Sequence, residues 1–360
     1  MTEKKNQHYI PKFYLRKFSV ENNEKQIGVF NIDNKIFIQR GKLKSQGSKN
    51  FFYGQDGKIE DHLSDIEGHL ATTLKDLIAD KNIPSKLSHS HINLLLFIVL
   101  TDLRNPVRIS LMLNTFDQVR NHIQTLDPNT NPDKFVPNLT HEEAVKMSLG
   151  NIMEVLPEIM DLEYKILYNT TNKPFITSDF PIVKYNQYLE LKKWIGTKSG
   201  YGLDGLQIFI PITPDLSLVF FDSAIYKVGD KKQKIIEITI DKDVDNLNIL
   251  QFVNCLGTIY FNEKANENYI RHLDSLATKF TRANSAKTSL SYLYKEGVDT
   301  DSLIEAGKPN LIVMGSTDVE TKLKLSFMKV HSKGQAKKLN KSMGQIRKHS
   351  QKLNELKNQR

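Results

Sequence analysis

Four side chains in the first half of the chain are of types that carry protons, bind metal ions or neutralise phosphate. They are His8, Glu67, Arg104 and Asp179. An imidazole can act as a general base near neutral pH. Two carboxylates can hold a divalent cation, and a guanidinium can neutralise a phosphate. We therefore predict that Asp179 and Glu67 bind Mg²⁺ or Mn²⁺, that His8 is the base and that Arg104 binds phosphate.

Each of these residues also has a purely structural interpretation. His8 stands among aromatic residues, where a histidine is often hydrogen-bonded rather than reactive. Asp179 precedes Phe180-Pro181, and an Asp in this context can close a side-chain-to-backbone turn. Glu67 falls on an amphipathic helix pattern, where a carboxylate can face solvent. Arg104 directly follows a core helix, and a buried guanidinium needs a partner, which could be Asp179, Glu67 or a ligand phosphate.

A weaker pattern points to a nuclease. Glu190-Leu191-Lys192 begins eleven residues after Asp179. Nucleases of the PD-(D/E)xK kind place an Asp and then Glu-x-Lys on adjacent strands, where the carboxylates bind Mg²⁺. The stronger nucleotide-binding, hydrolase and zinc-protease signatures are absent from the sequence.

The elements that must position these side chains can be read from periodicity. Residues 27–40 alternate around Asp33-Asn34 and predict a hairpin. Residues 58–80 have helical spacing, and a core helix follows from Ser88 or Ser90 through LLLFIVL to Arg104, where Asn105-Pro106 interrupts or kinks it. Thr140 and Glu143 form a capping-box pattern. Beyond Pro157 the pattern predicts strands, with 165–171 paired to 174–179 and further strands in 206–240. It also predicts helices over 243–256 and 264–280, and either a last short strand or a buried turn at 311–316.

Charge is concentrated at one end of the chain. The net charge is +9, yet residues 329–360 contain ten basic and one acidic residue, which leaves the other 328 residues neutral overall. One interpretation is a solvated or disordered basic tail. The other is a helix that forms on RNA, DNA or an acidic partner, with phosphate contacts from Lys337, Lys338, Lys341, Arg347 and Lys348.

Other features limit the location. The longest apolar run, residues 94–100, is too short for a membrane span, and MTEKKNQ has no apolar signal segment. Cys255 is the single cysteine, so no internal disulfide is possible. We expect a cytoplasmic protein with no membrane contact.

The segment HYIPKFYLRKF (8–18) resembles the opening motif of the domain of unknown function 4238 family, His-Tyr-x-Pro-x-x-Tyr-Leu-x-x-Phe. PFITSDFPI (174–182) is similar to that family's Phe-Ile-Thr-Ser-Asp-x-Pro-Val element. Arg104-Asn105-Pro106 and IPITPDLSLVF (210–220) match weaker elements, and the resemblance covers roughly residues 5–280. It implies a bacterial protein, often encoded on mobile genes, but no activity.

Together these patterns predict an α+β fold, with a helical N-terminal and middle region packed on an antiparallel β-sheet. We expect one domain over 5–284, helix-rich in 58–160 and β-rich in 164–262, followed by an extension over 285–328 and the basic tail over 329–360. The predicted function is a metal-dependent phosphodiesterase or nuclease acting on nucleic acid or nucleotides. The alternative is a non-enzymatic module that binds nucleic acid or protein through the basic C-terminal tail.

Overall fold

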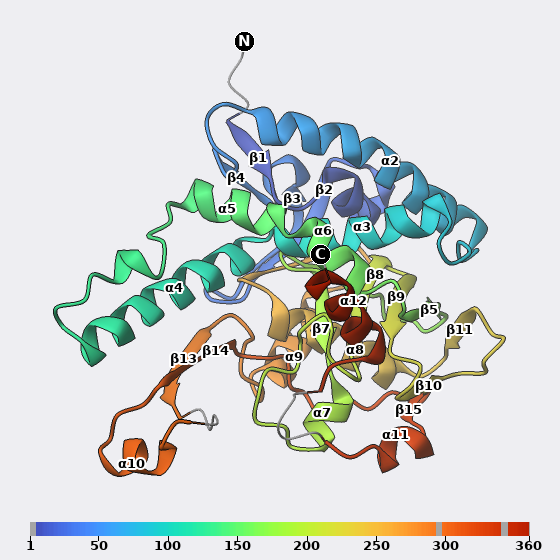
Figure 1. Ribbon diagram of the computed structural model, residues 1–360. Coiled ribbons are helices and arrows are strands. Elements are labelled where there is room, and N and C mark those ends of the chain that lie inside the picture. Colours follow the sequence, from blue (N-terminus) through green and yellow to red (C-terminus); the bar gives the residue numbers. More distant parts are fainter. Residues whose placement is uncertain (1–4, 293–296, 340–344, 360) are drawn as a thin grey trace.

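The computed structural model describes residues 5–292, 297–339 and 345–359 (Figure 1). Helices and several β-sheets alternate through the described chain, which confirms the α+β prediction. No helix in these three ranges combines the length and the apolar character needed to cross a bilayer.

The N-terminal segment is ordered by pairing and burial. β1 (Asn6–His8) pairs antiparallel with β4 (Ser48–Asn50), and α1 (Lys12–Leu15) follows Pro11. The predicted hairpin lies between α1 and β4 in the sequence and is formed by β2 (Gln26–Asn31) and β3 (Ile36–Lys42). The aromatic residues of the opening motif are core residues, since Tyr14 and Phe18 are fully buried.

A layer of helices follows, and side-chain caps mark the starts of three of them. It contains α2 (Lys58–Asp80), α3 (His89–Leu103), α4 (Pro106–Leu126), α5 (His141–Gly150) and α6 (Ile152–Glu158). Ser88 caps α3, and Thr140 and Glu143 form the predicted capping box. Asn105 caps α4 by accepting a hydrogen bond from the Val107 amide at 3.0 Å, with Pro106 in the first turn. Asn105-Pro106 therefore separates two helices instead of kinking one.

The central sheet has five strands in the order β11-β5-β9-β8-β7. The strands are β5 (Glu163–Asn169), β7 (Val183–Tyr185), β8 (Gln207–Thr213), β9 (Leu216–Phe221) and β11 (Ile235–Ile238). β5 pairs antiparallel with β9 on one side and parallel with β11 on the other. The sheet is therefore mixed, whereas the sequence predicted antiparallel pairing throughout.

Both faces of this sheet are buried. Ile208 and Ile210 belong to the core that includes Leu95 and Ile98 of α3. Phe209, between them, belongs to the core formed with α8 (Asp241–Asn254) and α9 (Glu267–Ala277). Side chains that alternate along β8 thus pack against one helical layer on each face of the sheet. The two predicted late helices are confirmed.

A second sheet contradicts the predicted pairing of 165–171 with 174–179. Its order is β3-β2-β12-β6, where β6 is Thr177–Ser178 and β12 is Thr258–Phe261. β6 pairs with β12, while β5 stays in the central sheet. The Asn169 side chain accepts from the Thr171 amide and donates to the Lys173 carbonyl, which turns the chain sharply between β5 and β6.

The C-terminal region packs on the body. β13 (Ala286–Ser291) and β14 (Leu311–Ser316) form a hairpin beside α4, with α10 (Thr300–Glu305) in the segment between them (Figure 1). β15 (Met328–Val330) pairs with β10 (Tyr226–Val228). α11 (Ser332–Ala336) and α12 (Lys348–Asn358) follow. The short α7 (Gln187–Leu191) lies after β7.

Candidate functional site

Arg104 is held inside the protein by Glu67. Its guanidinium is 1% exposed, and Nη1 donates to Glu67 Oε1 at 2.8 Å. Nε and Nη2 are buried without a hydrogen-bond partner among the described residues. Burial lowers the pKa of Arg104, but Tyr53 and Glu67 outweigh it and leave the pKa above its usual value. Glu67 is thus engaged by a cation of the protein itself.

His8 is a buried member of strand β1. Its Nε2 lies 3.2 Å from the carbonyl oxygen of Lys44. Burial, with the nearby charges of Lys12 and Arg104, lowers the pKa of His8 to about 4. The imidazole is therefore neutral at pH 7, and its basicity is weak for a general base working near neutrality.

Asp179 uses both carboxylate oxygens inside the protein. Oδ1 accepts from the Leu256 amide at 2.7 Å, and Oδ2 accepts from the amides of Gly257 and Thr258 at 2.9 Å each. Burial raises the pKa of Asp179 to about 6, although these three amides act in the opposite direction. Asp179 thereby ties the turn after α8 to the end of β6 through contacts that are distant in sequence. The local side-chain-to-backbone hydrogen bond at this turn comes from Ser178 instead, whose Oγ accepts from the Phe180 amide at 3.2 Å.

Glu67 pairs with Arg104, and the charge of Arg104 acts on His8, so these three side chains lie near one another. The carboxylate of Asp179 instead binds the backbone between α8 and β12. The link between Arg104 and Asp179 is Asn105, whose side-chain amide donates to the Asp179 carbonyl at 2.7 Å. Within residues 5–292, 297–339 and 345–359, no group of three or more His, Cys, Asp and Glu could hold a metal ion. None of the four predicted site residues lines the cavities described below.

The nuclease pattern does not have the required geometry. Glu190 and Leu191 lie on helix α7 and Lys192 caps it, so Glu-x-Lys is not on a strand. Glu190 accepts hydrogen bonds from the Tyr185 hydroxyl and the Lys322 amide. The pattern is a chance spacing in a charged segment.

The predicted nucleic-acid-binding residues of the tail have different environments. Arg347 is 3% exposed and forms an ion pair with Asp161, which corrects its assignment because its guanidinium is not available to a phosphate. Lys337 pairs with Asp204 at 2.5 Å. Lys338 and Lys348 are exposed, and Lys341 lies outside the described residues.

Sequence reasoning missed a charged cluster at the junction of α3 and α4. Asp102 is fully buried, and three side chains converge on its carboxylate. Arg108 Nε lies 3.0 Å from Oδ2 and 3.2 Å from Oδ1, Lys184 Nζ lies 3.2 Å from Oδ2, and the Tyr201 hydroxyl donates to Oδ2. Lys184 Nζ also lies 4.0 Å from the centre of the Tyr201 ring.

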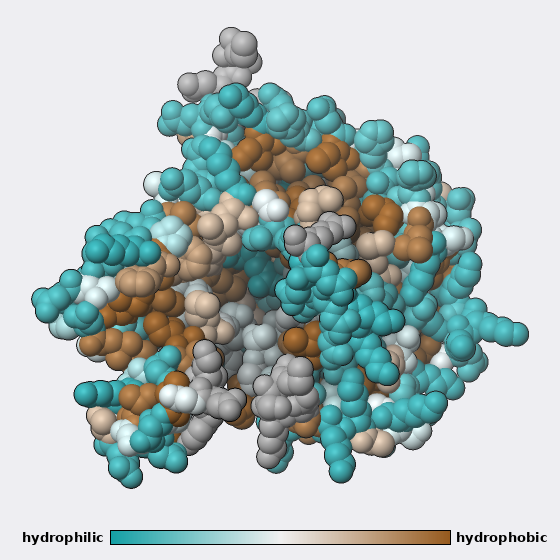
Figure 2. All heavy atoms as spheres, in the orientation of Figure 1, coloured by the Kyte–Doolittle hydropathy of each residue, from teal (hydrophilic) through white to brown (hydrophobic). Residues whose placement is uncertain are grey.

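This cluster forms part of the wall of an open cleft. A cavity of about 460 Å³ is lined by Asp102, Arg108, Lys184 and Tyr201, together with residues of α4 and the end of β14. Figure 2 shows that the surface is hollowed beside α4. Two cations contact one carboxylate here, which leaves a net positive charge of one among the groups in direct contact. The carboxylate of Asp318 also acts on Arg108 from further away.

Arg108 and Lys184 have N–H groups that do not bind Asp102. Arg108 makes hydrogen bonds only through Nε, and Lys184 Nζ makes one to Asp102, among the described residues. Burial lowers the pKa of Arg108, but Asp102 and Tyr201 outweigh this effect and raise it overall. The remaining N–H groups of both side chains can therefore bind an anion in the cleft.

A signal for this cluster exists in the sequence. Asp102 lies within the predicted core helix, two residues after its apolar run, and a buried carboxylate requires cationic or hydrogen-bonding partners. Arg108, six residues later, was one available partner.

No curated protein and no solved structure matches the chain. A family model described as "Protein of unknown function (DUF4238)" matches residues 6–265, a span that includes the Asp102–Arg108–Lys184–Tyr201 cluster and ends before the β13–β14 hairpin. The chain therefore belongs to the DUF4238 family.

Proposed function

We propose that the protein is a binding module for a phosphate-bearing ligand, held in the cleft by Arg108 and Lys184. The observation that carries this proposal is the cationic excess around Asp102, with guanidinium and ammonium donors left over at the cavity wall. Asp102 and Tyr201 fix the orientation of both cations, so little side-chain freedom is lost when an anion binds.

The shape of the site supports a ligand larger than an inorganic anion. A cavity of about 460 Å³ falls within the ~300–1,000 Å³ range of small-molecule sites. Leu111, Met112 and Phe116 of α4 supply apolar wall beside the charged cluster. This combination suits a nucleotide, in which a phosphate adjoins an aromatic base.

Metal-dependent hydrolysis remains the less favoured proposal. It requires free carboxylates around a cleft, whereas Asp179 is saturated by backbone amides and Glu67 pairs with Arg104. We expect no Mg²⁺- or Mn²⁺-dependent cleavage of RNA or DNA by the wild type. Cleavage that is lost in Asp179→Asn, in a variant shown to be folded, would restore the hydrolase proposal.

The tail contributes less to nucleic-acid binding than its charge predicts. Of the five residues proposed from sequence, Lys338 and Lys348 are the exposed ones among those described. We retain them as a secondary, non-specific phosphate contact. A cytoplasmic location is also proposed, because the buried thiol of Cys255 has no cysteine partner and suits a reducing compartment.

The cleft proposal can be tested without disturbing the buried cluster. Thr115 of α4 lines the cavity, whereas its neighbour Asn114 is exposed and does not. Thr115→Glu places a carboxylate in the cleft and should weaken nucleotide binding at least tenfold by calorimetry. Asn114→Glu, with the same change in net charge, should leave the affinity within twofold.

Direct removal of a cation gives a second test. Lys184→Met should abolish binding of nucleoside phosphates, and Arg108→Lys should weaken it while keeping the charge, because the planar fork is lost. Equal affinities in the wild type, Thr115→Glu and Lys184→Met, or no binding of any phosphate compound to the wild type, would refute the proposal.

A further inference from the structure

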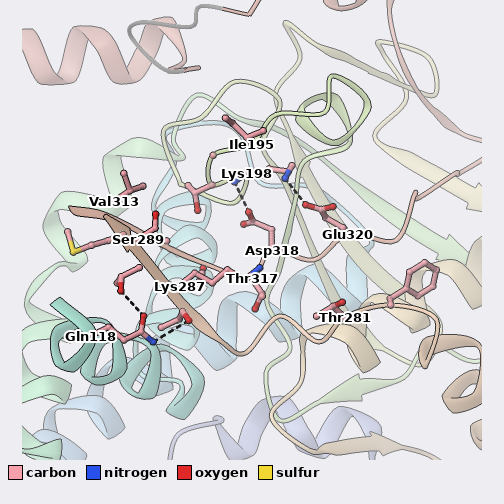
Figure 3. Close-up of a pocket in the computed structure, with 18 of the residues that line it drawn as sticks. Gln118, Ile195, Lys198, Thr281, Lys287, Ser289, Val313, Thr317, Asp318 and Glu320 are labelled. Carbon is pink, nitrogen blue, oxygen red and sulfur yellow. Dashed lines mark hydrogen bonds and ion pairs between the residues drawn. The ribbon is translucent and has the colours of Figure 1, made fainter. Parts of the chain in front are cut away.

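A larger cavity adjoins this cleft at the C-terminal hairpin. Its volume is about 850 Å³, and it is bounded by the hairpin, the 195–198 loop and residues 279–281 (Figure 3). Thr197 and residues 314–316 line both this cavity and the cleft beside Asp102. The two spaces therefore share one wall, the end of strand β14.

Strand β13, which pairs with the shared wall on β14, contacts helix α4. The Thr288 hydroxyl donates to Gln118 Oε1 at 2.9 Å, and His122 Nε2 lies 3.0 Å from the same hydroxyl (the Gln118 contact is drawn in Figure 3). The hairpin that carries the shared wall is therefore attached to α4 through side-chain contacts of Thr288.

The second cavity also has a cationic excess. Lys198, Lys279 and Lys287 line it, against Asp318 and Glu320. Lys198 pairs with Glu320 at 2.6 Å, and Asp318 accepts from the Lys198 amide (Figure 3). Asp318 also accepts from the Ser199 amide. Lys279 and Lys287 are exposed and have no ion pair with a described residue.

The lining also offers the other contacts that a nucleotide uses. Phe280 provides an aromatic ring, and Thr281, Ser289 and Ser316 provide hydroxyl groups. Stacking on an aromatic side chain and phosphate contacts to lysines are the two main contributions to binding of single-stranded nucleic acid.

We infer that the ligand of this protein is a single-stranded oligonucleotide of at least two nucleotides. One phosphate lies at Arg108 and Lys184, and the adjoining nucleotide crosses the end of β14 into the cavity of Lys279 and Lys287. This inference rests on the proposed function and extends it from a phosphate-bearing compound to a chain that occupies two cationic compartments.

The experiment measures how affinity depends on ligand length. A fluorescein-labelled tetranucleotide is bound to the full-length protein, and unlabelled mono-, di- and tetranucleotides compete for it in fluorescence anisotropy. The dinucleotide should compete at least tenfold better than the mononucleotide. The charge-reversed variant Lys279→Glu/Lys287→Glu should lose that advantage and keep its mononucleotide affinity within twofold.

Lys231→Glu/Lys232→Glu is the matched control, because it changes the net charge equally at exposed positions that line neither cavity. This control should retain the dinucleotide advantage. Equal competition by mono- and dinucleotide, or an advantage that survives in Lys279→Glu/Lys287→Glu, would overturn the inference and leave the proposed function intact. Failure of every phosphate compound to bind would instead refute the proposed function.

Discussion

The guanidinium of Arg347 binds the carboxylate of Asp161 through two contacts, Nε to Oδ2 at 3.0 Å and Nη2 to Oδ1 at 3.2 Å. Nη1 also donates to the Leu203 carbonyl at 2.9 Å, and Nη2 donates to the Glu158 carbonyl. A residue of the basic tail thus joins the end of α6 to the loop that carries Tyr201. The charge of the tail is partly structural.

Replacing Arg347 should therefore destabilise the fold. Arg347→Met leaves two carbonyls and a carboxylate without their donor, and we expect a loss of about 3 kcal/mol in the free energy of unfolding. Urea denaturation monitored by circular dichroism measures this change. Lys348→Met, at the adjacent exposed position, should change the value by less than about 0.5 kcal/mol. Equal stability of the two variants would show that the Arg347 contacts contribute nothing.

The Glu67–Arg104 pair should behave as a buried charge with a necessary partner. Glu67→Gln leaves the Arg104 cation buried without its counter-ion, and we expect a loss of about 2 kcal/mol, reduced because Glu67 is 23% exposed. Asp65→Asn, on an exposed position of the same helix, should be nearly neutral.

The double variant Glu67→Gln/Arg104→Met tests whether the effect is electrostatic. Removing both charges should recover at least half of the stability lost in Glu67→Gln, because the uncompensated cation is gone. A double variant that is less stable than Glu67→Gln by the full cost of Arg104→Met would show that the two residues act independently.

Much of the fold follows from local signals. The Thr140 capping box, the hairpin over 27–40 and the helices α2, α8 and α9 each depend on residues close in sequence, and each was predicted. The pairing of β6 with β12 depends on residues about 80 positions apart, such as Asp179 and Thr258, and no local pattern encodes it. The parallel placement of β11 beside β5 is non-local for the same reason.

The candidate site was missed for a related reason. His8 and Asp179 were selected because their types suggest chemistry, yet the carbonyl and the amide groups that engage them are invisible in the sequence. For Arg104, the partner found is Glu67, which is one of those expected. Lys184 and Tyr201 meet Asp102 from positions 82 and 99 residues away. The buried carboxylate was a sufficient reason to expect a cationic partner, but not to name Lys184.

His8 should make stability fall as the solution is acidified. Burial lowers its pKa from 6.5 to about 4, so the unfolded chain binds more protons than the folded protein between these values. The contribution is fully present above pH 6.5 and is lost as the pH falls toward 4, with a magnitude of about 3 kcal/mol. In His8→Gln this loss should be absent, which denaturation at pH 4, 5, 6 and 7 will measure. A parallel pH profile in wild type and His8→Gln would contradict the neutral imidazole.

Asp179 should act in the opposite direction over nearly the same range. Burial raises its pKa from 3.8 to about 6, so the folded protein binds more protons than the unfolded chain between these values. Its favourable contribution is complete below pH 3.8 and is lost as the pH rises through 6, again by about 3 kcal/mol. The two effects oppose each other in the wild type, which predicts a shallow profile of stability between pH 4 and 6.

Asp179→Asn removes the effect of the carboxylate, so this variant should gain stability relative to wild type as the pH rises from 4 to 7. His8→Gln should lose stability relative to wild type over the same range. If Asp179→Asn instead lost stability relative to wild type over that range, the carboxylate would be favoured in its charged form by the three amides, and burial would not be the dominant effect.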